Sequence, residues 1–368
     1  MNAATWLKAW DSQGPHRTGT AGDHAGAEWL AGEAAASIGQ AQGGQALGVH
    51  VNIEIFVLSR VDPVDAWVEC DSGRIEGVPV YDSPSTPPEG VSAPLAVACF
   101  SPWAVYTPDY RAARRAVTHA GLVIVCQGSR PGLGLLNAEQ FREPYGCPAI
   151  QIAETPATPP VRMVSFHQRT ETEARNVVVT IPGRDRTLPP LVVMTPRSSW
   201  WNSTSERGGG IVCWLETLRA LLAIQPLRDV VLTANSGHEL GHLGLDAFQA
   251  RRPGWEKPDG AIWVHYGANI GASGGVLSVQ SADEPLREAM RRVLTAAGQP
   301  PDTMAPPDQV PNGETRDIHL AGGRYVTLAG SSPLFHLPED RWPDAVDVPA
   351  IERVARGAAA LVVELASR

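Results

Sequence analysis

Long apolar runs and basic clusters are both missing from this sequence. Nowhere do about 18 apolar residues follow one another, which is the length that a membrane-spanning helix needs. The first residues, MNAATWLKAWDSQGPHRTG, lack the basic and then apolar segments of an export signal. Acidic residues outnumber basic ones by 39 to 30, and the net charge is −9. We therefore expect a cytoplasmic protein that binds neither membranes nor nucleic acid.

Cysteine is scarce as well. The five cysteines are odd in number and widely scattered: Cys70, Cys99, Cys126, Cys147 and Cys213. Because Cys99, Cys126 and Cys213 lie in apolar runs, we expect buried free thiols rather than disulfides or a metal cluster. Apolar residues make up 43% and charged residues 19% of the 368 residues. This composition is typical of a globular chain that can bury a large core.

Apolar stretches and stretches of helical periodicity alternate along most of the chain. Strands are expected at GVHVNIEIFVL, ARNVVVTIPG, PLVVMTP, RDVVLTANSG and GAIWVHYGAN, and helices at 23–39, 208–224, 242–252, 284–297 and 347–368. This alternation indicates an α/β domain with a mixed, largely parallel sheet. Ligands of such sheets bind at the carboxyl ends of the strands.

Residues 62–160 differ in character from the rest. Three short apolar strands, PLAVACFS, AGLVIVCQG and CPAIQIAE, accompany one helix at DYRAARRAVTHAG. No cluster of histidine and acidic residues occurs in this segment. We expect an inserted module without chemistry of its own, within a catalytic domain formed by residues 1–61 and 161–368.

The stretch NSGHELGHLG contains His238, Glu239 and His242 in the spacing His-Glu-x-x-His. On a helix, this spacing places two histidines one turn apart, where they can bind zinc beside a carboxylate base. However, a strand and a turn precede His238, and each of the three glycines in the stretch would destabilise a helix by about 1 kcal/mol relative to alanine. A helical zinc metalloprotease is therefore an alternative, which a strand-end turn before His238 would exclude.

A second interpretation comes from the order of motifs along the chain. LVVMTPRSSWW, SERGGGIVCWLE, VVLTANSGHELGHLGL, AIWVHYGANIG and FHLPEDRWPDAVD, in this order, resemble the metal-dependent aminopeptidase family. That family includes leucine-type bizinc aminopeptidases, glutamate carboxypeptidase and single-zinc glutaminyl cyclases. The resemblance implies a three-layer α/β/α domain, and residues 62–160 resemble the protease-associated insertion of many members.

The resemblance also implies where metal ligands would lie, and there the sequence departs from the family. Pro196 and Ser198 stand where the family has a His-x-Asp ligand pair. Glu206 stands at the position of the bridging aspartate. The family's glutamate pair, a general base followed by a ligand, is matched by His238 and Glu239. One of the two metal positions has therefore lost a ligand.

The remaining ligand positions fall on two histidines. His265 replaces an aspartate at a strand end, and His336 of FHLPED matches the last histidine of the family. Glu206, Glu239 and His336 then retain one metal site, with His265 as a fourth ligand. The resemblance thus implies one divalent ion, zinc in the first place, with manganese or iron as alternatives.

The function that we expect is metal-assisted hydrolysis or acyl transfer. The bond would be an amide, peptide or related C–N bond of a small-molecule or short peptide-like substrate. His238 is the candidate acid or base, because an unperturbed imidazole pKa of about 6.5 suits proton transfer at neutral pH. The rival hypothesis is a metal-free descendant that binds a ligand or a partner. The sequence leaves open whether the chain forms a homo-oligomer.

Three further residues are candidates for binding the substrate. Trp200 and Trp201 could form an apolar wall, and Arg197 could bind a substrate carboxylate. Some of the candidate residues could instead have purely structural roles. Glu206 could pair with a neighbouring arginine at a loop surface, and His336 could be hydrogen-bonded by the aspartate of FHLPED.

Overall fold

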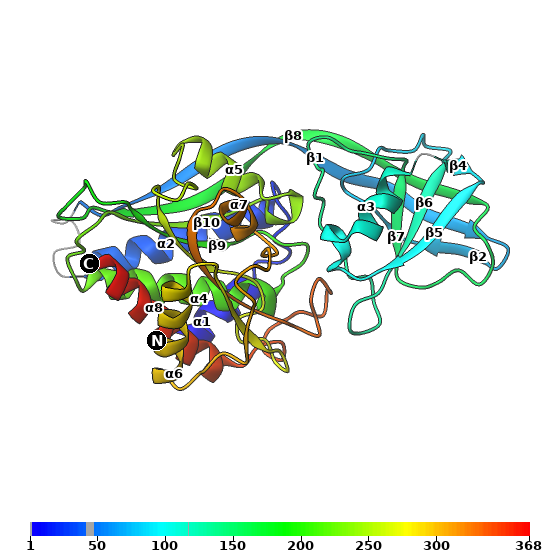
Figure 1. Ribbon diagram of the computed structural model, residues 1–368. Helices are drawn as coiled ribbons and strands as arrows, with labels where there is room; N and C mark the ends of the chain where they lie inside the picture. The colour runs from blue at the N-terminus through cyan, green and yellow to red at the C-terminus, as the bar shows by residue number, and fades with distance from the viewer. Residues whose placement is uncertain (1, 42–47, 117) are drawn as a thin grey trace.

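The computed structural model describes residues 2–41, 48–116 and 118–368, which form one large sheet and a smaller one (Figure 1). The strands of the 10-stranded sheet lie in the order β13 (Thr303–Met304), β12 (Leu277–Gln280), β14 (Arg324–Gly330), β11 (Ile262–Tyr266), β9 (Leu191–Pro196), β10 (Val230–Asn235), β8 (Arg162–Ile181), β1 (His50–Cys70) and β2 (Gly73–Glu76), with β4 (Val91–Ser92) beside β8. The central strands β14, β11, β9 and β10 are parallel, whereas β10, β8, β1 and β2 pair antiparallel. The expected mixed sheet is confirmed.

Helices cover both faces of the large sheet. One face packs against α1 (Ala3–Asp11), α2 (Ala21–Gln40), α4 (Thr204–Leu222), α6 (Glu284–Ala296) and α8 (Val348–Ala366). The other face packs against α5 (Leu243–Ala250) and α7 (Thr315–Leu320). Every residue of β9 and β10 is buried, as expected for valine-rich strands covered on both sides. The three-layer arrangement is therefore confirmed.

Glycines at the start of α4 bring that helix close to the strand ends. A Cβ atom at Gly209 would lie 1.9 Å from the carbonyl oxygen of Ile270, and one at Gly210 would lie 2.5 Å from Thr195 Oγ1. Glycine costs about 1 kcal/mol in a helix relative to alanine, but no larger residue fits here. The close approach places the residues of the first turn of α4 beside the carboxyl ends of β9 and β11.

The inserted module is built on two long strands. β1 and β8 pair along their whole length, from His50 opposite Thr180 to Glu69 opposite Arg162, and run out of the large sheet into the module (Figure 1). The small sheet has the order β3 (Val78–Pro79), β7 (Ala149–Ile152), β6 (Gly121–Cys126) and β5 (Leu95–Phe100), with η2 (Ala104–Tyr106) and α3 (Pro108–Arg115) after β5. The expected strands and helix are present, although residue 117 of the expected helix lies outside the described residues. The expected boundary at residue 62 falls inside β1.

Two details differ from the sequence analysis. Cys99 is exposed rather than buried, because its side chain points away from the small core beneath β5. Within the described ranges all five cysteines are free thiols, as expected. α1 and α7 were not expected, because both are short and α7 follows a proline-rich loop. In the part of the chain that the structure describes, no helix has the length and apolar character needed to cross a membrane.

Candidate functional site

The His-Glu-x-x-His stretch forms a turn at the end of β10 and not a helix. Residues His238–Leu240 form one 3-10 turn between two glycines with positive φ, at 79° and 77°. His242 also has a positive φ, of 63°, and α5 begins only after it. His238 and His242 therefore do not lie one turn apart on a helix. The helical zinc-metalloprotease alternative is wrong.

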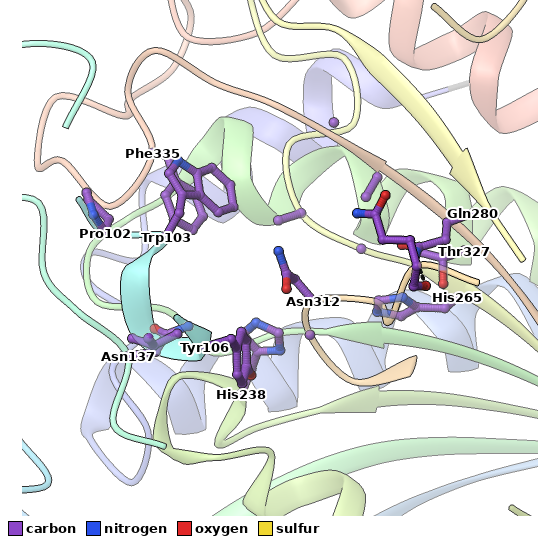
Figure 2. A pocket seen from close by; sticks show the side chains of 17 residues that line it. Pro102, Trp103, Tyr106, Asn137, His238, His265, Gln280, Asn312, Thr327 and Phe335 are labelled. Atoms are coloured by element: carbon purple, nitrogen blue, oxygen red, sulfur yellow. Dashed lines mark hydrogen bonds between the residues drawn. The ribbon is translucent and has the colours of Figure 1, made fainter. Parts of the chain in front are cut away.

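A pocket with a volume of about 200 Å³ lies at the carboxyl ends of β10, β11 and β14 (Figure 2). Its lining residues from the large domain include His238, His265, Gln280, Asn312, Thr327 and Phe335, and those from the module include Pro102, Trp103, Tyr106 and Asn137. Trp103 of the module stacks on Phe335 with the ring centres 3.7 Å apart. The module therefore forms one wall of the pocket.

Two pocket histidines face one buried carboxylate. His238 Nδ1 lies 4.0 Å from Glu314 Oε1, and His265 Nε2 lies 3.8 Å from Glu314 Oε2. His238 Nδ1, His265 Nε2 and Glu314 Oε2 are buried and have no hydrogen-bond partner among the described residues. Buried polar atoms normally have partners, so an unfilled cluster of this kind is typical of a functional site.

The environment of this cluster changes its protonation. Burial, followed by the charges of Arg207 and His242, holds the pKa of His238 well below its ordinary value. Burial, with the charges of His242 and Arg207, lowers the pKa of His265 to about 3. Burial raises the pKa of Glu314 to about 7. At neutral pH both imidazoles are therefore uncharged, and Glu314 can gain or lose a proton.

Sequence reasoning missed Glu314. It lies at the end of the proline-rich loop, immediately before α7, and belongs to no motif. Only the packing of that loop against β10 and β11 brings the carboxylate to His238 and His265. Asn235, at the end of β10, donates a hydrogen bond of 3.5 Å to Glu314 Oε1.

Glu206 and Arg207 form a buried ion pair in the first turn of α4. Glu206 Oε1 lies 2.8 Å from Arg207 Nη2 and 3.3 Å from His336 Nε2, and all three side chains are at most 1% exposed. Burial alone would raise the pKa of Glu206, but the charges of Arg207 and His336 outweigh it and lower the pKa to about 2. The pair expected at a loop surface is therefore present, but in the interior.

Asp340 does not hydrogen-bond His336, which was one role expected for it from the sequence. Its carboxylate accepts hydrogen bonds from the backbone N–H groups of Ser205, at 2.6 Å, and Glu206, at 3.0 Å. His336 Nδ1 is instead hydrogen-bonded to the carbonyl oxygen of Leu135 in the module. A carboxylate at a helix N-terminus is stabilised by the free N–H groups there, which explains this choice of partner.

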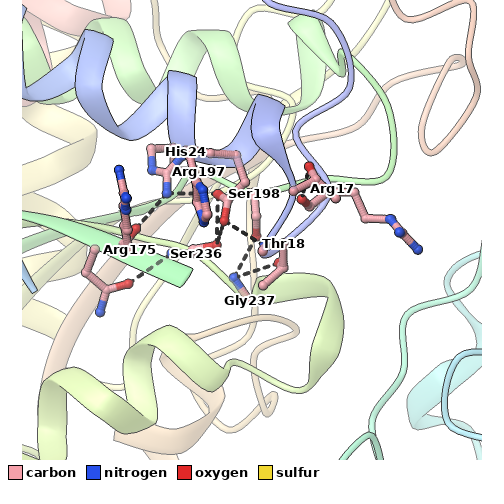
Figure 3. Close-up of polar contacts among 12 residues, drawn as sticks. Arg17, Thr18, His24, Arg175, Arg197, Ser198, Ser236 and Gly237 are labelled. Carbon is pink, nitrogen blue, oxygen red and sulfur yellow. Dashed lines mark hydrogen bonds and ion pairs between the residues drawn. The ribbon is translucent and has the colours of Figure 1, made fainter. Parts of the chain in front are cut away.

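Both carboxylate oxygens of Glu239 accept hydrogen bonds. Oε1 accepts from the backbone N–H of Thr18, at 3.1 Å, and from its hydroxyl, at 2.6 Å. Oε2 accepts from the hydroxyl of Ser198 at 2.5 Å. The backbone N–H of Gly237 donates to both hydroxyl oxygens, as Figure 3 shows. Ser198, at the place of a family ligand, therefore ties Glu239 to the strand ends.

The expected substrate-binding residues lie elsewhere. Arg197 is fully buried and pairs with Asp23 at 2.8 Å, and it donates to the carbonyl oxygen of Arg175 (Figure 3). Trp200 is stacked in the core, and Trp201 Nε1 donates to the carbonyl oxygen of His336. None of these three is among the residues that line the pocket. Their contact with a substrate stays a prediction, and their surroundings suit structural roles.

The four expected metal ligands do not fit a shared ion as they are arranged. Glu239 gives its oxygens to Thr18 and Ser198, and Glu206 is paired with a cation. Over residues 2–41, 48–116 and 118–368, no group of three or more His, Cys, Asp and Glu side chains is arranged to hold a metal. The metal role of Glu206, Glu239, His265 and His336 stays a prediction that this geometry does not support.

Neither a protein-family model nor a curated protein matches this sequence. Solved structures with the same fold include a zinc aminopeptidase from Bacillus subtilis, at 15% identity and a TM-score of 0.75, which covers 100% of this chain and 95% of that one. A peptidase precursor from Shewanella amazonensis has 15% identity and a TM-score of 0.72, covering 100% and 93%. A glutaminyl cyclase from Porphyromonas gingivalis has 12% identity and a TM-score of 0.51, covering 99% and 97%. The chain therefore has the fold that its motif order predicted.

Proposed function

We propose that this chain is a hydrolase that cleaves an amide, peptide or related C–N bond in a small substrate bound beside His238 and His265. The observation that supports this proposal is that His238 and His265, which line a pocket at the strand ends, converge on the buried Glu314, and each of the three has an unpartnered polar atom. Ligand sites of α/β sheets lie at this edge. The aminopeptidase and glutaminyl cyclase with the same fold suggest a peptide-like substrate.

His238 is the proposed acid and base. Its Nδ1 faces Glu314, so Nε2 is the ring nitrogen left for the substrate. In this scheme a water molecule attacks the substrate carbonyl while the neutral His238 takes its proton, and the carboxylate of Glu314 offsets the burial that otherwise disfavours the imidazolium. The imidazolium then returns the proton to the leaving nitrogen as the C–N bond breaks. The products are a carboxylic acid and an amine.

The pocket walls indicate the kind of substrate. Trp103, Tyr106 and Phe335 provide an aromatic wall, whereas Gln280 and Asn312 provide amide groups. Such a pocket suits one apolar group beside a peptide or amide unit. A cavity of about 200 Å³ holds a single amino-acid derivative or a short peptide end.

A metal ion at the four residues expected from the sequence would supply Lewis-acid activation of the substrate carbonyl. It would require Glu239 to leave Thr18 and Ser198, and Glu206 to leave Arg207. We therefore assign no step to it.

A second candidate function is binding without catalysis. It is favoured by Glu239, whose carboxylate is held by Thr18 and Ser198, and by the buried pair of Glu206 with Arg207. These contacts give the two carboxylates partners within the protein, as is usual for buried polar groups with a structural role. The pocket beside them would then hold a small peptide-like ligand that is not cleaved.

A substrate screen separates the two functions. Aminoacyl 4-nitroanilides, aminoacyl amides and short peptides are incubated with the wild type, His238→Ala and the exposed control His50→Gln, and products are measured by mass spectrometry. We expect turnover by the wild type and the control, and a loss of about 10²–10⁴-fold in His238→Ala. Ligand-induced thermal stabilisation without turnover would favour the binding function. Turnover that is equal in all three proteins would refute the role of His238.

A further inference from the structure

Arg207 is a buried positive charge beside Glu206, which lies next to His336, and both of these residues were expected to bind a metal. Its Nη2 lies 2.8 Å from Glu206 Oε1, and Glu206 Oε1 lies 3.3 Å from His336 Nε2. Its side chain is fully buried. A guanidinium keeps its positive charge in proteins. Arg207 is therefore a fixed cation at this position.

The position of the guanidinium is fixed by a second contact. Arg207 Nε donates a hydrogen bond of 2.7 Å to the carbonyl oxygen of Ser198, the second residue after β9. Within the described ranges, Nη1 and Nη2 of Arg207 have no hydrogen-bond partner. The same is true of both carboxylate oxygens of Glu206 and of Nε2 of His336. The ion pair is thus held by charge attraction and by one hydrogen bond from Arg207 to the backbone. Its remaining polar atoms are buried.

Charge balance argues against a second cation at this place. One buried carboxylate, Glu206, faces one buried guanidinium, so the pair is neutral. The other carboxylate expected to bind the metal, Glu239, accepts hydrogen bonds from the hydroxyl groups of Thr18 and Ser198. A divalent ion would meet the repulsion of Arg207, and the guanidinium already offsets the charge of the Glu206 carboxylate that such an ion would reach.

We propose that the guanidinium of Arg207 takes the place of the metal ion in this cleft, so that the chain supplies its own cation and binds no catalytic metal. This proposal goes beyond the reaction assigned to the pocket and holds whether the pocket cleaves its ligand or only binds it. The proposal accounts for three residues: Arg207 after Glu206, Ser198, which donates to Glu239, and Pro196 at the end of β9. Arg207 supplies the positive charge of a metal, and Ser198 and Pro196 stand where metal ligands were expected.

The test is the metal content of variants that remove this cation. Wild type, Arg207→Met and the control Arg219→Met, from the same helix, are purified without chelators or a histidine tag. Arg219 suits the comparison because it pairs with Glu216 but lies 30% exposed. Each protein is incubated with zinc, passed through a desalting column and measured by plasma mass spectrometry and by a thermal scan.

We expect no retained zinc and no thermal shift in the wild type and in Arg219→Met. Arg207→Met, which leaves Glu206 and His336 without their cation, is expected to retain about one zinc ion per chain and to melt higher with zinc than without it. One zinc ion per chain in the wild type, lost in His336→Ala, would overturn the proposal. A folded Arg207→Met that retains no zinc would overturn it as well.

A variant that does not fold is also informative. If Arg207→Met is unfolded, it is refolded with and without zinc. The double variant Glu206→Gln with Arg207→Met, in which both charges are removed, is refolded for comparison. Recovery of the far-ultraviolet circular dichroism signal by zinc supports the proposal. Folding of the double variant alone, with no rescue of the single variant by zinc, contradicts it. Because the readout is metal content and folding, it is independent of the activity screen with His238→Ala.

Discussion

Acid should destabilise this protein through His16, a buried histidine in the loop between α1 and α2. Its ring is fully buried and stacks on Trp10 with centres 3.5 Å apart. Burial, reinforced by the charge of Arg197, lowers its pKa from 6.5 to about 3. In the unfolded chain the ring takes up a proton near pH 6.5, but in the folded protein it does so only near pH 3.

The sign and size of the effect follow from this difference. Below pH 6.5 the unfolded state binds more protons at His16 than the folded state does, so the free energy of unfolding falls as the pH falls towards 3. Each pH unit in this window costs at most about 1.4 kcal/mol. Between pH 6.5 and pH 5 the loss due to this one ring is therefore about 2 kcal/mol.

The assay is urea unfolding at pH 6.5 and pH 5 of wild type, His16→Gln and the exposed control His50→Gln. His16→Gln is less stable at pH 6.5, because it loses the stacking on Trp10, but its free energy of unfolding should fall by about 2 kcal/mol less on acidification than that of the wild type. The control should follow the wild type. The other buried histidines are common to all three proteins and cancel. Equal losses in wild type and His16→Gln would refute the reasoning.

Two further predictions concern an ion pair and an aromatic stack. Arg197→Met should lower the free energy of unfolding by about 3–5 kcal/mol, because Asp23 is left buried and unpaired, and Asp23→Asn combined with Arg197→Met should recover part of that loss in urea unfolding. A double variant no more stable than Arg197→Met would contradict this. Trp103→Ala should weaken ligand binding by about 3- to 10-fold through loss of its stack on Phe335, measured by calorimetry, and unchanged affinity would show that the module wall does not contact the ligand.

The elements predicted well are those with a strong local pattern. The valine-rich strands β8, β9 and β10 and the long helices α2, α4 and α8 appear where apolar periodicity placed them. α7 was missed because six residues carry too little periodicity, and the length of β8 was missed because its exposed middle part, residues 168–173, is polar in sequence. Patterns report on local burial, so they cannot show how far a strand continues into another part of the molecule.

The candidate site was predicted less completely than the fold. The position of His265 at a strand end followed from the sequence, and the structure places it in the pocket. The partners of Glu239 and of His336 could not be predicted, because Thr18 and Leu135 lie far away in the chain. Glu314 belongs to a loop without a motif. A side chain's neighbours across the fold decide whether a carboxylate is free to bind an ion, and no spacing rule contains them.

The paired strands β1 and β8 have a mechanical consequence. They carry the module away from the large sheet as a two-stranded ribbon, and their register shifts between Pro63 and Asp65, where the ribbon enters the module. A bulge of this kind bends and twists a strand locally. Because Trp103 belongs to the module and Phe335 to the large domain, the course of the ribbon sets how the two rings meet in the pocket wall. The pocket wall thus depends on the shape of a β-ribbon rather than on that of a connecting loop.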